Sequence, residues 1–139
     1  MDMKFELVVL PVSDVDRAKA FYEKAGFRLD VDHSAGEDFR VVQLTPPGSA
    51  CSITIGKGLT QAQPGSYQGL HLVVTDIEVA RNELRTRGVD VSDVFHFGPN
   101  GQTPGLDPER RDYGSFASFS DPDGNGWLLQ EVRQRTPGR

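Results

Sequence analysis

The chain has 139 residues, of which 37% are hydrophobic and 25% are charged, a balance typical of a globular protein of about one domain. Its 15 basic and 20 acidic residues give a net charge of −5, and because the acidic residues are scattered we expect no nucleic-acid partner. No apolar run approaches the roughly 18 residues needed to cross a bilayer, and the first residues lack a secretory-signal pattern. We therefore expect no membrane association and a cytoplasmic location.

The first half of the chain predicts a strand, a helix and three more strands. The apolar run over residues 5–12 indicates a buried strand, and Ser13 follows it as the expected N-cap of a helix. Gly26 is expected to end that helix, because glycine takes the positive φ of a C′ residue without strain. Short β-like runs separated by turn residues then predict strands over residues 27–32, 39–45 and 51–55.

The second half of the chain repeats this order. Residues 12–19 match residues 74–81 in chemical character at nearly every position. A strand over residues 70–74 leads into Thr75, which has the spacing of a capping box with Glu78. Further strands are expected over residues 89–97, 113–119 and 127–132, the last two joined by turn residues 121–126.

The repeat predicts an α+β fold of two tandem βαβββ modules within a single domain, residues 1–139. The parts are a first module over about residues 4–55, a linker over 56–68, a second module over about 69–132 and a tail over 133–139. The longest loop is expected over residues 98–112. A loop of that length in a compact domain is often functional, but the sequence leaves its role open.

Two parts of the sequence resemble a known family. The stretches LPVSD (Leu10–Asp14) and AFYEKAGF (Ala20–Phe27) resemble the opening of vicinal oxygen chelate proteins, and FSDPDGNGW (Phe119–Trp127) resembles their closing hairpin. This superfamily includes glyoxalases, bleomycin-resistance proteins and extradiol dioxygenases. The resemblance implies a curved mixed sheet around a half-barrel cleft, with the helices on the outer face. It also implies a homodimer, and it leaves open whether the cleft forms within one chain or across two.

Metal-dependent members of that family place His or Glu ligands on the cleft side of the first and last strands of each module. Those positions fall here on Leu7, Gly69 and Leu128, with the fourth near Ser52 or Thr54. None of these residues supplies a carboxylate or an imidazole. We therefore expect no cofactor and no metal site.

The alternative is a divalent metal ion bound in a shifted register. His71 lies two positions after Gly69, so strand alternation puts it on the cleft side. Glu131 lies three positions after Leu128, and the same alternation turns it toward the helix side or the strand end. These two residues are the candidates for such a shifted site.

Strand alternation also predicts the lining of the cleft. The residues expected to contact a ligand are Leu7, Val9, Gly69, His71, Leu128 and Gln130, with Arg111 and Tyr113 contributed by the long loop. This lining is apolar with two polar groups, which suits a flat aromatic or hydrophobic molecule. An arginine of the loop either reaches an anionic group of the ligand or pairs locally with Asp107 or Glu109.

The sequence favours a protein that binds or sequesters a small organic molecule without metal, in the manner of bleomycin-resistance proteins, with antibiotic resistance as its expected role. The alternative is an enzyme of the same superfamily, similar to lactoylglutathione lyase or to an isomerase or dioxygenase. Such an enzyme would use metal ligands in a shifted register, or His71 as a metal-free general base and the one candidate catalytic residue. The sequence does not name the ligand or substrate.

Overall fold

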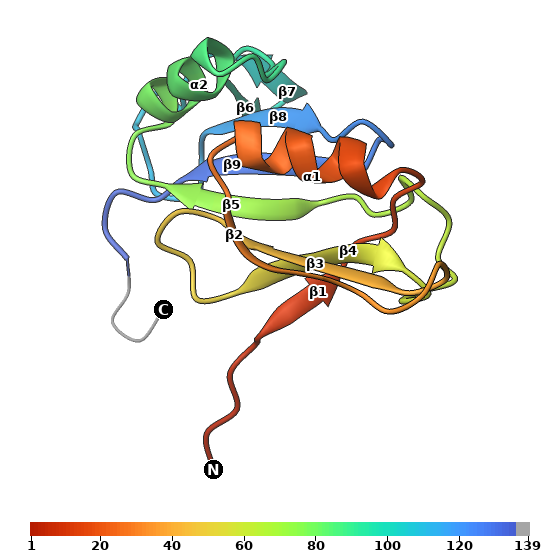
Figure 1. Ribbon diagram of the computed structural model, residues 1–139. Coiled ribbons are helices and arrows are strands. Elements are labelled where there is room, and N and C mark those ends of the chain that lie inside the picture. Colours follow the sequence, from red (N-terminus) through yellow and green to blue (C-terminus); the bar gives the residue numbers. More distant parts are fainter. Residues whose placement is uncertain (136–139) are drawn as a thin grey trace. The chain divides into compact units, whose positions relative to one another are not determined.

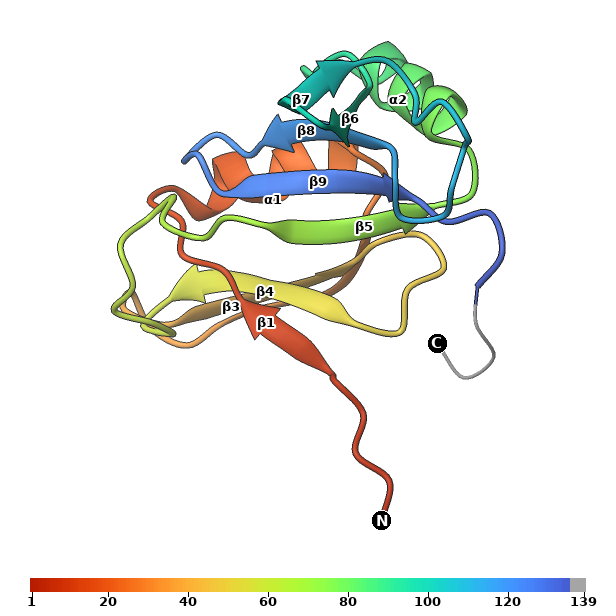
Figure 2. The same ribbon diagram turned by 180° about the vertical axis from the view of Figure 1, so that it is seen from behind.

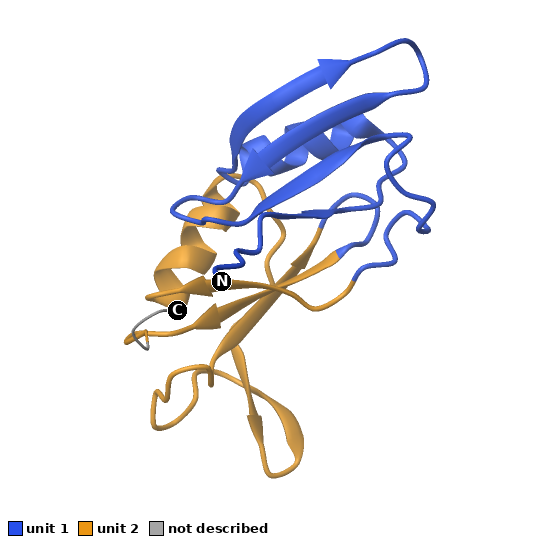
Figure 3. Cartoon of the chain, turned by 90° about the horizontal axis from the view of Figure 1, so that it is seen from below, with its two compact units in different colours: residues 1–67, 121–125 blue, residues 68–120, 126–139 orange. Residues whose placement is uncertain are grey.

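The computed structural model describes residues 1–135 of the chain. They form two mixed sheets, each with one helix packed against it (Figure 1). The chain divides into two units (Figure 3). Unit 1 is Met1–Tyr67 with Asp121–Asn125, and unit 2 is Gln68–Ser120 with Gly126–Arg139. Within the described part, neither helix has the length and apolar character needed to span a membrane.

Unit 1 contains the first βαβββ module. Its elements are β1 (Leu7–Val9), α1 (Val15–Lys24), β2 (Arg28–Ser34), β3 (Arg40–Thr45) and β4 (Ser52–Lys57). The sheet order is β1-β4-β3-β2, with β1 parallel to β4 and the other neighbours antiparallel. Helix α1 packs against β3 and β4 through its apolar stripe, so the core of the unit lies between helix and sheet. The buried core residues are Leu10, Val15, Ala18, Tyr22, Ala25, Phe27, Val42, Leu44, Ile53 and Ile55.

Unit 2 contains the second module. Its elements are β5 (Leu70–Val74), α2 (Ile77–Thr86), β6 (Phe95–Gly98), β7 (Gly101–Pro104), β8 (Phe116–Ser120) and β9 (Gly126–Glu131). The sheet order is β5-β9-β8-β6-β7, and Figure 2 shows β9 between β5 and β8. Strand β5 runs parallel to β9, and the other pairs are antiparallel. Helix α2 packs against β8 and β9.

The α+β fold of two βαβββ modules is confirmed, but two predicted segments of the second module are wrong. The strand expected over residues 89–97 is limited to β6, because Val89 and Val91 are buried without strand pairing. The loop expected over residues 98–112 contains β7, which pairs with β6 as a hairpin. Gly101 stands at its turn with a φ of 97°, a conformation that glycine takes without strain.

The predicted N-caps of the two helices are also wrong, by one residue in each module, whereas Gly26 directly follows the C-cap of α1 as predicted. The N-caps are Asp14, whose carboxylate accepts from Arg17 N at 3.0 Å, and Asp76, which accepts from the backbone at the start of α2. A carboxylate satisfies the free N–H groups and also meets the positive end of the helix dipole. The Ser13 hydroxyl instead donates to Asp123, so Ser13 has a different role.

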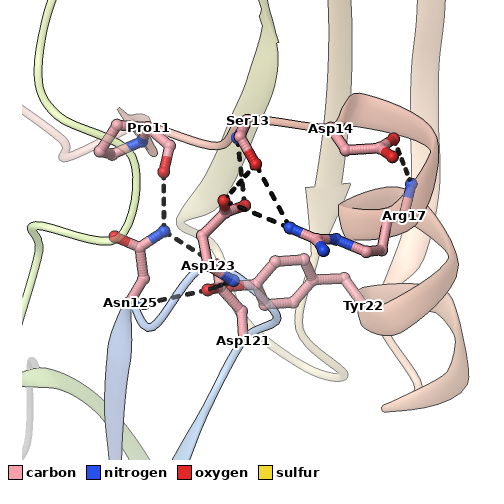
Figure 4. Close-up of polar contacts among 8 residues, drawn as sticks. All are labelled: Pro11, Ser13, Asp14, Arg17, Tyr22, Asp121, Asp123 and Asn125. Atoms are coloured by element: carbon pink, nitrogen blue, oxygen red, sulfur yellow. Dashed lines mark hydrogen bonds and ion pairs between the residues drawn. The ribbon is translucent and has the colours of Figure 1, made fainter.

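The turn Asp121–Asn125 is part of unit 1 although its flanking strands are in unit 2. Figure 4 shows its contacts with the start of the chain. The buried Asp121 accepts a hydrogen bond from the Tyr22 hydroxyl at 2.9 Å and another from Asn125 Nδ2 at 2.9 Å. Asn125 Nδ2 also donates to the Pro11 carbonyl at 2.8 Å. The two segments that carry the family resemblance are therefore joined by buried hydrogen bonds.

Candidate functional site

The parallel register of β5 and β9 assigns each side chain of the unit-2 sheet to one of two faces. His71 lies opposite Leu128, and Val73 lies opposite Gln130, so these four side chains share one face. We call this the open face, because His71 and Val73 are exposed on it. The opposite face carries Leu129, which is 1% exposed, and α2 packs on that side.

An aromatic cluster continues the open face across β8 and β6. Phe116 lies opposite Gln130, and Phe95 lies opposite Phe116. The rings of Phe95 and Phe116 stack at 5.7 Å, and Phe97 meets Phe116 edge to face at 5.3 Å. Phe97 is 61% exposed, so an aromatic surface is open to solvent at this end of the sheet. None of these three residues was among the predicted ligand contacts, although the alternation of Phe95 and Phe97 was the available signal.

The two polar groups predicted for the cleft both lie on the open face. His71 Nδ1 is 2.7 Å from the Gly69 carbonyl oxygen, and Gln130 Nε2 donates to the Tyr113 carbonyl oxygen at 3.1 Å. Gly69 precedes β5 with a φ of 76°, and a Cβ built there would meet no atom within 4 Å. The positive φ explains the glycine, and the empty space leaves room beside His71.

The loop before β8 is fixed by two arginine–carboxylate pairs. Arg111 binds Asp107 through Nε at 3.0 Å and Nη2 at 2.9 Å, and it lies 3.4 Å from Glu109. Arg110 binds Glu131 through Nε at 2.7 Å and Nη2 at 2.9 Å. The structure thus favours local pairing over a free arginine for Arg111. The pair of Arg110 with Glu131 was not predicted.

Glu131 ties the loop to helix α2. Its carboxylate is fully buried and accepts from the Ile77 N–H at the start of α2 at 3.0 Å, in addition to Arg110. The hydrogen bonds from Arg110 lower the pKa of the Glu131 carboxyl, against the raising effect of burial, and the Ile77 N–H adds to the lowering. Because this carboxylate points toward α2, His71 and Glu131 lie on opposite faces of the sheet.

Two residues of this loop have left-handed backbone conformations, Arg110 with a φ of 52° and Tyr113 with a φ of 67°. Such conformations cost free energy in residues with a side chain and persist where surrounding contacts determine them. Tyr113 is held through both of its peptide groups: its N–H donates to the Glu131 carbonyl at 2.8 Å and its carbonyl accepts from Gln130. Tyr113, one of the predicted ligand contacts, is thereby fixed beside the open face.

The matching face of the unit-1 sheet is more polar. Leu7 lies opposite Ser52 and Val9 lies opposite Thr54, so these four side chains share a face. The Ser52 hydroxyl is 2.7 Å from that of Thr45, and the buried Thr54 hydroxyl has no hydrogen-bond partner. The fourth family ligand position was predicted near Ser52 or Thr54. Either residue places a hydroxyl group on this face of the sheet.

The donor set does not fit a divalent metal ion at the family's positions. Leu7, Gly69 and Leu128 offer no donor side chain, and the fourth position offers a neutral hydroxyl. Among residues 1–135, no group of three or more His, Cys, Asp or Glu side chains is placed to hold a metal ion. Three or more good ligands are what such an ion requires.

Comparisons with known proteins identify the family of the chain. The model of the Glyoxalase/Bleomycin resistance protein/Dioxygenase superfamily matches residues 4–129. TnmS3, described as an antibiotic binding protein from Streptomyces sp. CB03234, is 33% identical with a TM-score of 0.72, over 94% of this chain and 97% of TnmS3.

Two further proteins are similar over most of their length. A glyoxalase/bleomycin resistance protein from Streptomyces sp. CB03234 is 35% identical with a TM-score of 0.68, over 92% of this chain and 100% of that protein. The uncharacterized protein YetH of Bacillus subtilis (strain 168) is 26% identical over 126 residues, which are 89% of this chain and 94% of YetH.

Replacing Glu131 tests the loop anchor. We expect Glu131→Gln to lower the free energy of unfolding at neutral pH by roughly 1–3 kcal/mol, because Arg110 loses its charged partner. Since the folded-state pKa of Glu131 is lowered, its contribution is present above the ordinary glutamate pKa and is lost as pH falls through the folded-state value. The difference in unfolding free energy between the wild type and this variant should therefore shrink on acidification.

Urea unfolding from neutral to acidic pH measures this difference. The matched control is Glu109→Gln, since the Glu109 side chain is 73% exposed and its replacement should change stability by less than about 0.5 kcal/mol. Equal effects of the two substitutions, or a difference that does not depend on pH, would contradict an anchoring role for Glu131.

Proposed function

Because the chain belongs to the Glyoxalase/Bleomycin resistance protein/Dioxygenase superfamily, we propose that it binds a small aromatic or hydrophobic organic molecule on the open face without a metal ion, and so sequesters a drug or metabolite. One observation carries the proposal. The open face combines exposed aromatic and aliphatic side chains, Phe97 and Val73, with a small number of polar groups. Surfaces of this composition suit ligands held by burial and oriented by a few hydrogen bonds.

The energetics favour a flat ligand. Covering roughly 200 Å² of apolar surface contributes about 5 kcal/mol at about 25 cal/mol per Å², before the cost of ordering the ligand. A ring system lying on Phe97 and Phe116 adds offset or edge-to-face contacts, since aromatic rings prefer those geometries. Hydrogen bonds must add to these contributions if binding is to be tight. His71, Gln130 and Ser118 are the polar side chains on the open face that can make them.

The relatives support the same class of ligand. TnmS3 is described as an antibiotic binding protein, and 33% identity over nearly the whole chain supports an antibiotic as the kind of small molecule that this chain binds. A role in antibiotic resistance, a cytoplasmic location and a homodimeric state remain proposals of the same kind.

The competing function is an enzyme of the superfamily with His71 as general base. The observation in its favour is the position of His71, an exposed imidazole with one nitrogen fixed by a backbone carbonyl. A general base requires such an oriented nitrogen. The groups beside His71 in register are Leu128 and, one strand further, Ser118, and neither is ionisable. Because no acid partner lies in that row, we give binding precedence over catalysis.

A charge placed on the open face tests the binding proposal. We expect Val73→Glu to reduce affinity at least tenfold for any member of a panel of aromatic antibiotics, flavins and polyketides that the wild type binds, because a carboxylate beside an apolar ligand must lose water. Val79→Glu is the matched control, since Val79 is 60% exposed on α2 and should leave affinity unchanged. Calorimetric titration measures both. No binding tighter than millimolar across the panel, or equal losses in both variants, would contradict the proposal.

Metal loading tests the metal-free part of the proposal. Untagged protein incubated with nickel, zinc, iron or manganese and then desalted should retain no stoichiometric metal by elemental analysis, because the family's ligand positions hold no carboxylate or imidazole. The control is the same protein with His71→Ala. Stoichiometric uptake that this substitution abolishes would overturn the proposal and favour the shifted-register enzyme.

A further inference from the structure

We propose that the ligand of the open face is an aromatic molecule that carries hydroxyl groups, and that it donates hydrogen bonds to Nε2 of His71 and Oε1 of Gln130. This inference rests on the proposed function and names the chemical class that the open face selects. It follows from an account of which donors and acceptors on that face are already used.

His71 presents an acceptor. A carbonyl oxygen can only accept a hydrogen bond, so the 2.7 Å contact between His71 Nδ1 and the Gly69 oxygen requires the proton on Nδ1. In the neutral imidazole, Nε2 is then the unprotonated nitrogen and an acceptor. His71 is exposed, and the absence of a side chain at Gly69 leaves space next to it.

Gln130 presents a second acceptor. The Tyr113 carbonyl can only accept, so the amide group that reaches it at 3.1 Å is the nitrogen of Gln130. This orientation leaves the amide oxygen Oε1 with its acceptor capacity. His71 lies opposite Leu128, and Gln130 lies opposite Val73, which is the next residue of β5 on the same face. The two acceptors are therefore diagonal neighbours on one face.

The charges argue against an anionic ligand. No lysine or arginine stands among the open-face residues His71, Val73, Phe95, Phe97, Phe116, Ser118, Leu128 and Gln130, or at Gln102, Pro104 and Ser120, which the register places on the same face. The two arginines of the neighbouring loop are bound by Glu131 and Asp107, each through two nitrogens. A carboxylate or sulfonate on the ligand would thus face hydrogen-bond acceptors, and both arginines are already bound by protein carboxylates. A hydroxyl group of the ligand can instead donate a hydrogen bond to His71 Nε2 or Gln130 Oε1.

The aromatic part of the ligand follows from Phe97 and Phe116, whose rings extend the same face beyond Gln130. Ser118 lies opposite Leu128, in the row of His71, and its hydroxyl both donates and accepts. It tolerates either type of substituent and does not alter the selection. The open face is consequently matched to a flat ring system with hydroxyl donors along one edge.

The test compares β-naphthol with its methyl ether, by calorimetric titration at about pH 8, where imidazole is ordinarily neutral. The ether retains the ring and has more apolar surface, but it has no hydrogen to donate. We expect the wild type to bind β-naphthol roughly two- to tenfold more tightly, the range that one net hydrogen bond gives. The double variant His71→Phe with Gln130→Leu should bind the two probes with a ratio near one.

The matched control is His96→Phe. His96 makes the same contact, from Nδ1 to the Gly105 carbonyl at 2.8 Å, but its neighbours Phe95 and Phe97 alternate with it along β6, so it points away from the open face. This variant should keep the wild-type preference for β-naphthol. Thermal unfolding of each variant verifies that it is folded.

A second measurement needs no substitution. The imidazole ¹⁵N resonances of His71 should show Nε2 unprotonated in the free protein and shifted on addition of β-naphthol, with a smaller shift on addition of the ether. Binding of both probes with equal affinity and an unperturbed His71 would overturn the hydroxyl inference while leaving aromatic binding intact. Failure of both probes and of the wider aromatic panel would instead reject the proposed function itself.

Discussion

The parallel pairing of β5 with β9 is the constraint on which the candidate site depends. It places Gln130 on the open face and Glu131 on the helix face, one residue apart, and both hold the loop that precedes β8. Gln130 binds the Tyr113 carbonyl, and Glu131 binds Arg110 and the first turn of α2. A slip of β9 by one residue would exchange its two faces, removing the Gln130 acceptor from the open face and the Glu131 carboxylate from the helix.

The buried carboxylate of Glu131 explains how an irregular loop keeps two left-handed residues in place. A buried charge is costly unless it is paired and hydrogen-bonded, and Glu131 is both. The same contacts keep Arg110 and Arg111 occupied by protein carboxylates, which decides the electrostatic character of the site. The open face is therefore defined by hydrogen-bond acceptors and apolar surface, and Arg110 and Arg111 of the neighbouring loop are paired with carboxylates.

Much of this arrangement follows from simple sequence rules, because strand alternation is local. The order of elements and the separation of His71 from Leu72, or of Gln130 from Glu131, come directly from a period of two along each strand. The aromatic cluster was not placed in this way, because apolar residues recur through residues 89–97 while only Phe95–Gly98 forms a strand. The pairing of Arg110 with Glu131 joins a loop to a strand 21 residues further along the chain, and a local sequence pattern cannot predict a contact over that separation. The N-caps were missed because Ser13 and Asp14 are both good caps, and only the contact of Ser13 with Asp123 decides between them.

The most direct test of the account is methyl NMR of β5 and β9 during titration with an aromatic ligand. Ring currents from a molecule on the open face should shift the methyl resonances of Val73 and Leu128. The resonances of Leu72 and Leu129, which lie next to them in sequence but on the other face, should change little. Larger shifts at Leu72 and Leu129, or shifts confined to unit 1, would show that the ligand binds elsewhere and would contradict the account.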